Sequence, residues 1–176
     1  GDVYKRQVQG EGGIYPATKE FMEGIRKICD DNDIIMICDE IQCGMGRTGK
    51  MYAFQHYNVK PDIITTAKAL GCGVPVGAFV AGEKCCDSLV PGDHGTTYGG
   101  NPFAAAAINA VFDQFEKLQV PEHAKEIGTY LWDKLEELKE KHDCITGHRG
   151  IALMQGLEFN ADHPVGDIVK NCLLYT

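Results

Sequence analysis

The amino-acid sequence predicts an α/β fold in which helices cover a mostly parallel sheet. Two observations indicate this fold class. From Pro16 to Asp31 the apolar residues recur at the spacing of one helical face. This segment runs directly into residues 34–38, an apolar and largely β-branched run that is typical of a strand buried on both faces. A helix that leads into a buried strand indicates layers of helix and sheet.

Two further strands are predicted at residues 63–65 and 78–80, which are short apolar runs. A polar loop with three glycines separates the first predicted strand from the second. A glycine-rich segment, residues 71–75, separates the second from the third. Glycines of this kind mark the turns and loops between elements.

Two helices are predicted in the second half of the chain. Asn101 and Pro102 form a strong helix start, because asparagine caps a helix and proline suits its first position. This alanine-rich helix is expected to end near residue 117, and Pro121 begins another that ends near His142. Residues 150–159 are then predicted to be a strand that enters a further structural unit.

The composition excludes several classes of partner. The 176 residues contain 17 Lys and Arg against 25 Asp and Glu, a formal net charge of −8, and no run of basic residues. Nucleic acids and anionic membranes are therefore poor partners. The eight cysteines lie in apolar runs or beside each other, which predicts reduced thiols and a cytoplasmic location. No apolar stretch approaches the ~20 residues that cross a bilayer, so a soluble protein is expected.

Three polar residues stand where the predicted strands end. Asp39 follows the strand at 34–38, Gln42 comes shortly after it, and Lys68 follows the strand at 63–65. Ligands bind at the carboxyl ends of parallel strands, so these side chains are expected to converge on one crevice. An acid, an amide and a lysine indicate either an ion-paired structural site or a carbonyl cofactor bound through the lysine.

Patterns of other enzyme classes were also considered, and each is incomplete or missing in this sequence. Residues 44–50 have the spacing of a phosphate-binding loop, and residues 37–40 resemble the magnesium-holding strand of a nucleotide hydrolase. Met51, however, replaces the Ser or Thr that would bind magnesium, and the order of the two segments is reversed. The six histidines are scattered and no Cys-x-x-Cys pair occurs, so no metal site is predicted. A Gly-x-Ser-x-Gly nucleophile elbow is also missing.

Five ordered segments resemble the class III, or ornithine-type, aminotransferases, which use pyridoxal 5'-phosphate. The segments are residues 9–13 (QGEGG), 38–44 (CDEIQCG), 46–49 (GRTG), 61–70 (PDIITTAKAL) and 96–102 (TTYGGNP). The resemblance implies an internal fragment of a fold-type I transferase. Residues 8–119 would belong to the cofactor-binding large domain. Residues 120–171 would form the connecting helix and the start of the C-terminal small domain.

The resemblance also implies the role of each site residue. Lys68 looks like the lysine that condenses with the cofactor aldehyde and later moves the substrate proton, and Asp39 like the carboxylate that keeps the pyridine nitrogen protonated. Gln42 resembles the amide that bonds the phenolic oxygen. Thr97 resembles the hydroxyl that reaches the cofactor phosphate across a homodimer interface. Glu11 resembles a switch carboxylate that pairs with an arginine while no substrate carboxylate is bound.

The implied reaction is a transamination between a small-molecule amino donor and 2-oxoglutarate. Residues 91–102 look most like the enzymes that act on N-acetylornithine in arginine biosynthesis. Enzymes that act on 4-aminobutyrate or ornithine are the alternative, and a non-catalytic module that acts through its dimer surface is another. Arg47 is interpreted as a residue that holds its loop against the neighbouring subunit. The fragment alone is expected to be inactive, because other family site residues lie outside it.

Residues 1–7 and 172–176 depart from the family pattern. Arg6-Gln7 stands where the family has Glu-Pro before Val-Gln-Gly-Glu. Both ends are interpreted as foreign sequence, a leader and a tail, and are excluded from the fold prediction.

Overall fold

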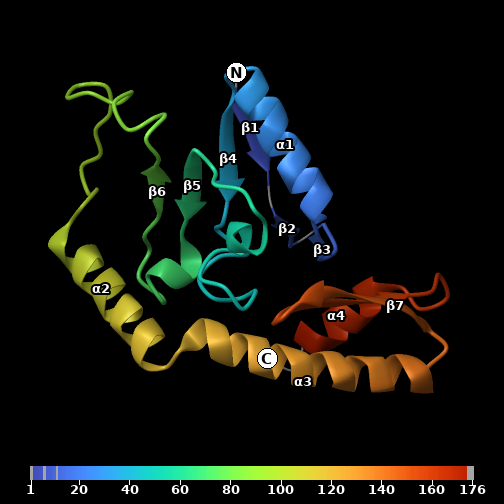
Figure 1. The fold of residues 1–176 in the computed structure, drawn as a ribbon. Helices are drawn as coiled ribbons and strands as arrows, with labels where there is room; N and C mark the ends of the chain where they lie inside the picture. Colours follow the sequence, from blue (N-terminus) through green and yellow to red (C-terminus); the bar gives the residue numbers. More distant parts are fainter. Residues whose placement is uncertain (1, 6, 11, 174–176) are drawn as a thin grey trace.

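The computed structural model describes residues 2–5, 7–10 and 12–173 (Figure 1). Two short 3₁₀ helices, η1 and η2, supplement its strands and α-helices. The elements follow in the order β1 (Asp2–Lys5), β2 (Val8–Gln9), β3 (Tyr15–Pro16), α1 (Lys19–Asp31), β4 (Ile35–Asp39), η1 (Ala53–His56), β5 (Ile63–Thr66), η2 (Lys68–Leu70), β6 (Ala78–Ala81), α2 (Pro102–Lys117), α3 (Val120–Lys141), β7 (Ile145–Ile151), β8 (Met154–Phe159) and α4 (Val165–Leu173).

The central sheet has four strands in the order β1-β4-β5-β6. β4 pairs in parallel with β1 and with β5, whereas β6 is antiparallel to β5. Figure 1 shows these strands side by side, with the long helix α3 crossing below their ends. The predicted α/β class with a mostly parallel sheet is therefore confirmed.

Helix α1 packs on one face of the sheet and forms the main core. Its predicted start at Pro16 was wrong, because Thr18 caps the helix and accepts a hydrogen bond from the Phe21 N–H at 3.2 Å. A side-chain oxygen at this position satisfies an N–H that the first turn leaves unpaired. The core between α1 and the sheet consists of Met22, Cys29, Met36, Cys38 and Val59.

Strand β4 is fully buried on one face only. Met36 and Cys38 lie in the core under α1, whereas Ile35 and Ile37 remain half-buried. The prediction of a strand buried on both faces was wrong for this chain, because α1 packs on the side of Met36 and Cys38.

The predicted helices of the second half are confirmed as α2 and α3. Asn101 caps α2, since its Oδ1 accepts from the Ala104 N–H at 2.9 Å, and Pro102 occupies the first helical position. Gln119 joins the two helices in a left-handed conformation with φ 48°. This residue sets the change of direction between α2 and α3 in Figure 1.

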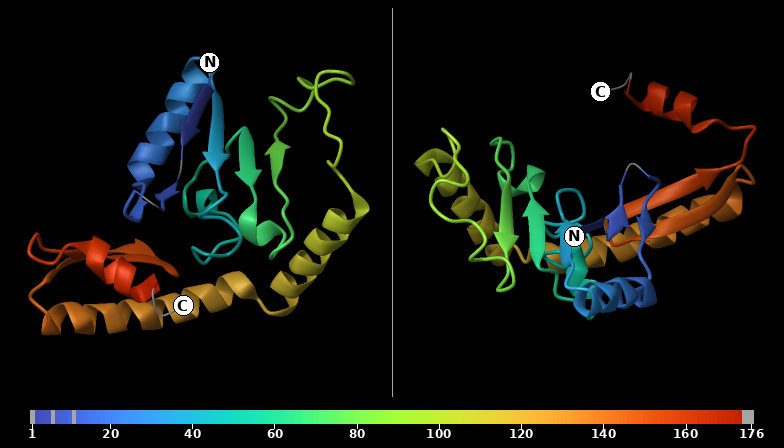
Figure 2. Two further views of the ribbon diagram at one scale, coloured as in Figure 1. Left: turned by 180° about the vertical axis from the view of Figure 1, so that it is seen from behind. Right: turned by 90° about the horizontal axis from the view of Figure 1, so that it is seen from above.

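The segment after α3 forms a hairpin of β7 and β8. The strand predicted over residues 150–159 is confirmed for residues 154–159 as β8, but its predicted start was wrong and β7 was not predicted. The turn between the strands contains Ala152, which has a left-handed φ of 48°. Gln155 fixes the hairpin on α3, because its Nε2 donates to the carbonyl oxygens of Gly128 at 2.7 Å and Ala152 at 2.5 Å. Figure 2 shows the hairpin alongside α3. Helix α4, which was not predicted, follows the hairpin.

Parts of both ends of the chain, which were left out of the fold prediction, belong to regular elements: β1 at the start and α4 at the end. Residues 2–5 form β1, and the buried Gln7 accepts from the Ala17 N–H at 2.8 Å through its carbonyl oxygen. Residues 1, 6 and 174–176 lie outside the described part. The foreign origin of residues 1–7 and 172–176, and the domain limits at 119 and 171, stay predictions. Within the described ranges, no helix has both the length and the apolar character to cross a membrane.

Asp62 joins α1 to the sheet, and its loss tests this packing. Its Oδ2 accepts from Arg26 Nη1 at 2.9 Å and from the Met36 N–H at 2.7 Å. We expect Asp62→Ala to lower the free energy of unfolding by about 3 kcal/mol, because a largely buried guanidinium keeps only the exposed Asp30 as a charged partner and the Met36 N–H loses its side-chain acceptor. Urea denaturation measures the change. Asp31→Ala, which removes an exposed partner of Lys27, is the control and should change stability by less than about 0.5 kcal/mol. Equal losses in both variants would contradict this account.

Candidate active site

The ends of β4 and β5 bring the predicted acid and lysine to one edge of the sheet. β4 ends at Asp39, and the parallel register places Asp39 opposite Thr65 of β5. Lys68 begins η2, directly after β5. Because parallel strands end at the same edge, Asp39 and Lys68 stand where ligand sites form in α/β sheets.

Lys68 and Gln42 line one cavity of about 300 Å³. Arg47 lines it as well, and its carbonyl oxygen accepts from the Leu153 N–H at 3.1 Å. The apolar part of the lining comes from distant segments and includes Ile14, Leu153 and Met154. The structure therefore brings Lys68 and Gln42 together and closes one side of their cavity with the β7–β8 hairpin. Asp39 is not among the lining residues and lies at the adjoining strand end.

The Asp39 carboxylate is buried, with 5% of the residue exposed. Its Oδ1 accepts from the Ile41 N–H at 3.0 Å and from Thr65 Oγ1 at 3.4 Å. These donors orient the carboxylate, and a buried carboxylate requires such partners.

The backbone of Lys68 is left-handed, with φ 52°. Residues other than glycine rarely adopt this conformation, and such strain gathers at functional sites. The N–H of Leu70 bonds the carbonyl oxygen of Ala67 at 3.0 Å, so the tight turn of η2 holds the strained residue. The side chain of Lys68 is exposed, which leaves its amine accessible to a ligand.

The amide of Gln42 packs against the backbone of Gly10. A Cβ at Gly10 would overlap the Gln42 amide group. Gly10 begins the turn between β2 and β3, and its carbonyl oxygen accepts from the N–H groups of Gly13 at 3.0 Å and Ile14 at 3.2 Å. Glycine therefore allows this turn to lie directly against the site. Gly10 was not singled out from the sequence, although it stands in the matching segment QGEGG.

Glu40 is a fully buried carboxylate beside the site. It was not predicted from the sequence to be a site residue. Its two oxygens accept from the N–H groups of Ala53 and Phe54, both at 2.8 Å, and Cys43 Sγ lies 3.3 Å from Oε2. Glu40 thereby ties the end of β4 to η1. Burial raises the pKa of Glu40, although the two backbone donors oppose that shift. The sequence signal for Glu40 was its position directly after Asp39, the acid at the end of the predicted strand.

Thr97, unlike Lys68 and Gln42, is not brought to this cavity. Thr97 is exposed in the loop between β6 and α2 and does not line the cavity of Lys68. Its role across a dimer interface stays a prediction. Glu11 lies outside the described residues, so its role stays a prediction as well.

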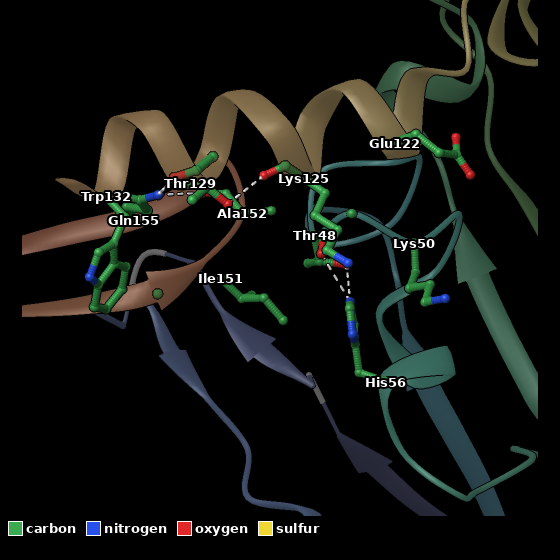
Figure 3. A pocket seen from close by; sticks show the side chains of 13 residues that line it. Thr48, Lys50, His56, Glu122, Lys125, Thr129, Trp132, Ile151, Ala152 and Gln155 are labelled. Atoms are coloured by element: carbon green, nitrogen blue, oxygen red, sulfur yellow. Dashed lines mark hydrogen bonds between the residues drawn. The ribbon is translucent and has the colours of Figure 1, made fainter. Parts of the chain in front are cut away.

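A second and larger cavity, of about 510 Å³, lies between residues 48–50, α3 and the β7–β8 hairpin (Figure 3). His56 stands in its wall, with Nε2 3.0 Å from the Thr48 carbonyl oxygen. Burial lowers the pKa of His56, and the charges of Lys50 and Lys125 act in the same direction. Lys68, Asp39, Gln42 and Thr97, the predicted site residues within the described chain, do not line this cavity, so the smaller cavity with Lys68 is the candidate active site.

The fold and the site define an α/β protein with a lysine site at the carboxyl ends of its strands. The chain belongs to the class-III aminotransferases, since residues 6–173 match the family described as aminotransferase class-III. This family depends on pyridoxal phosphate. The family predicted from the five ordered segments is therefore confirmed.

Curated relatives agree with this membership. The chain is 52% identical over 168 residues to the acetylornithine aminotransferase of Methanocaldococcus jannaschii, with 94% of this chain and 41% of the relative covered. It is 48% identical over 171 residues to the acetylornithine aminotransferase of Clostridium acetobutylicum, with 97% and 44% covered. The chain thus spans less than half the length of the curated relatives that it matches.

Solved structures of aminotransferases have the same fold. Ornithine aminotransferase from Plasmodium yoelii matches with a TM-score of 0.86 and 33% identity, over 94% of this chain and 45% of that one. Acetylornithine aminotransferase from Elizabethkingia anophelis matches with 0.84 and 37%, over 89% and 39%. Taurine:2-oxoglutarate aminotransferase from Bifidobacterium kashiwanohense, solved with PLP and glutamate, matches with 0.85 and 37%, over 90% and 36%.

Glu40 should give the protein a measurable pH dependence. Because its pKa is raised in the folded state, its contribution to stability is full below the unfolded pKa and is lost as the pH rises through the folded pKa. Glu40→Gln removes this loss but leaves one of two buried N–H groups without an acceptor, which costs about 1–3 kcal/mol. The substitution should therefore cost more stability at about pH 5 than at about pH 8.

Urea denaturation of both proteins at the two pH values measures this difference. Glu126→Gln, on the exposed side of α3, is the matched control. A cost of Glu40→Gln that grows with pH would show that the folded protein prefers the charged carboxylate, contrary to this account.

Proposed function

We propose that the full-length protein that contains this chain, the parent enzyme, transfers the amino group of N-acetylornithine or a related ω-amino donor to 2-oxoglutarate in arginine biosynthesis. The observation that carries the proposal is the shared cavity of Lys68 and Gln42 beside the buried Asp39. Relatives that are acetylornithine aminotransferases, at 46–52% identity, support this donor. Ornithine is the second candidate, because ornithine aminotransferase structures at 33–35% identity match the fold with a TM-score of 0.86.

The residues of the site fit pyridoxal phosphate. An accessible amine, an amide and a buried carboxylate are the groups that suit an aldehyde, a phenolic oxygen and a pyridine nitrogen. When bound, the cofactor supplies a protonated ring that accepts the electron pair of the donor's C–H bond. Lys68 would hold the aldehyde carbon, Gln42 the phenolic oxygen and Asp39 the ring nitrogen.

Each of these residues has a defined task in the transfer. With the cofactor bound, the amine of Lys68 would take the proton from the donor carbon as a general base and, as a general acid, would give it to the cofactor carbon that held the aldehyde. Asp39 would hold a proton on the ring nitrogen, and the donors from Ile41 and Thr65 keep its carboxylate oriented. The apolar side chains of Ile14 and Met154 limit the access of water to the cavity.

The parent enzyme is proposed to be a cytoplasmic homodimer in which Thr97 completes the partner's site by bonding the cofactor phosphate. The region around Thr97 supports this arrangement, because Tyr98 is 82% exposed and Phe103 72% exposed. Large exposed apolar side chains of this kind mark surfaces that a partner covers. The eight free cysteines support a reducing compartment.

The donor assignment is tested by steady-state kinetics of the parent enzyme with 2-oxoglutarate as acceptor. N-acetylornithine should give a higher kcat/KM than ornithine or 4-aminobutyrate. Lys68→Ala should lower kcat by at least about a thousandfold, because it removes the group that carries the proton. Lys117→Ala, at the exposed end of α2, is the control and should keep the activity. Turnover retained by Lys68→Ala would refute the site, and a preference for ornithine would refute the donor.

Gly10→Ala tests the position of Gln42. The added Cβ would displace the Gln42 amide, so the cofactor would lose a hydrogen bond and bind about tenfold more weakly. Absorbance titration of the cofactor-free parent enzyme with pyridoxal phosphate measures the dissociation constant. Gly24→Ala is the matched control, because a Cβ at Gly24 in α1 meets no atom within 4 Å. An unchanged dissociation constant in Gly10→Ala would count against the role of Gln42.

A further inference from the structure

Ile14 has an unusual backbone conformation for its residue type. It lies in the wall of the Lys68 cavity, and its φ is 57°. A β-branched residue in the left-handed region is rare, because its two branches crowd the backbone. Such a conformation persists only where the surrounding structure holds it, and it is concentrated at functional sites.

A single side chain contacts both chain neighbours of Ile14. Arg149 of β7 donates from Nε to the carbonyl oxygen of Gly13 at 2.5 Å, and its guanidinium lies 4.2 Å from the centroid of the Tyr15 ring. Glu158 of β8 in turn lies 3.1 Å from Arg149 Nη1. The hairpin therefore fixes the backbone on either side of Ile14, although it is far away in the sequence.

The side chain of Ile14 is packed against the same hairpin. A Cβ at Gly156 of β8 would lie 3.3 Å from Ile14 Cγ1, so glycine provides the room for this contact. Ile14 also packs against the buried cluster that contains Val8, Cys43 and Met154. Its position is thus determined by the hairpin from one side and by the core from the other.

We propose that Arg149 is a positioning residue that holds Ile14 in the wall of the Lys68 cavity, and that Ile14 limits the width of the donor that this cavity accepts. The inference rests on the proposed function, since it concerns the donor of that reaction. Ile14, Leu153 and Met154 form an apolar part of the cavity wall. It accepts an unbranched carbon chain next to the amine and excludes a bulky group on the carbon that bears the amine.

The contacts of Arg149 with Gly13 and Tyr15 form a clamp around Ile14. The first test measures this clamp and does not depend on turnover. Arg149→Lys keeps a positive charge for Glu158 but loses the planar fork that reaches Gly13 and Tyr15 together. Hydrogen exchange of the Gly13 and Ile14 amides, both bonded to Gly10, should become about tenfold faster in the parent enzyme. The amides of α2 serve as the internal reference. Unchanged exchange at Gly13 and Ile14 would overturn the role of Arg149.

The second variant of the clamp is Tyr15→Leu, which removes the ring below the guanidinium. Tyr15 is 48% exposed, so this substitution leaves the core intact. It should increase exchange at the same amides as Arg149→Lys. Exchange that rises throughout the protein, in place of a rise confined to this turn, would also contradict the clamp.

The width of the cavity is tested by the ratio of kcat/KM for N-acetylornithine to that for 3-amino-3-phenylpropanoate, which has a phenyl group on the carbon that bears the amine. Ile14→Ala and Arg149→Lys should both lower this ratio by at least about tenfold, because the wall recedes. Ile151→Ala is the control: Ile151 belongs to the same hairpin but lines the larger cavity. A merely structural role of Arg149 would lower both rates and leave the ratio unchanged.

The failures of the two proposals are distinguishable. A wild-type parent enzyme that converts no donor would refute the proposed function and the limit on donor width with it. A wild-type enzyme that converts N-acetylornithine, with a ratio that is the same in wild type, Ile14→Ala and Arg149→Lys, would refute the further inference alone.

Discussion

The parallel pairing of β4 with β5 is the constraint on which the site depends. Its register, with Asp39 opposite Thr65, determines which residues leave the sheet at the same edge. A slip of one residue would turn every side chain of a strand to the other face, and the acid would no longer stand beside the lysine. The hydrogen bond from the Glu40 N–H to the Thr65 carbonyl oxygen, 2.9 Å, extends the pairing past the last residue of β4. The point at which the chain leaves the sheet is thereby fixed.

The rest of the cavity is assembled by contacts between segments that are distant in the sequence. The turn after β2 supplies Gly10, which lies against Gln42, and the hairpin supplies Arg149, which holds that turn at Gly13. The hairpin is itself fixed on α3 by Gln155. The strand ends therefore place the reactive groups, and the packing of the hairpin on α3 and on this turn sets the shape around them.

The parts of the fold with a strong local signal could be predicted from the sequence. The β-branched run of β4 and the cap of α2 at Asn101 both depend on neighbouring residues only. The β7–β8 hairpin was missed because its turn contains the apolar Ala152 and Leu153 in place of the usual turn residues. Strands β2 and β3 are only two residues long, too short for a periodic pattern.

The residues of the candidate site also divide into those with a local sequence signal and those without one. Lys68, Asp39 and Gln42 were predicted as site residues because they stand at predicted strand ends and in segments that resemble the family. Arg149 and Gly10 could not be found, because their roles arise from contacts that the sequence does not express locally.

The central claim is that Lys68 is the one lysine placed to bind the cofactor. Incubation of the parent enzyme with pyridoxal phosphate, reduction with borohydride and peptide mapping test this claim most directly. The account predicts that the reduced label is confined to Lys68 and is lost in Lys68→Ala. Label spread over exposed lysines such as Lys50 and Lys125, or label that persists in the variant, would contradict it.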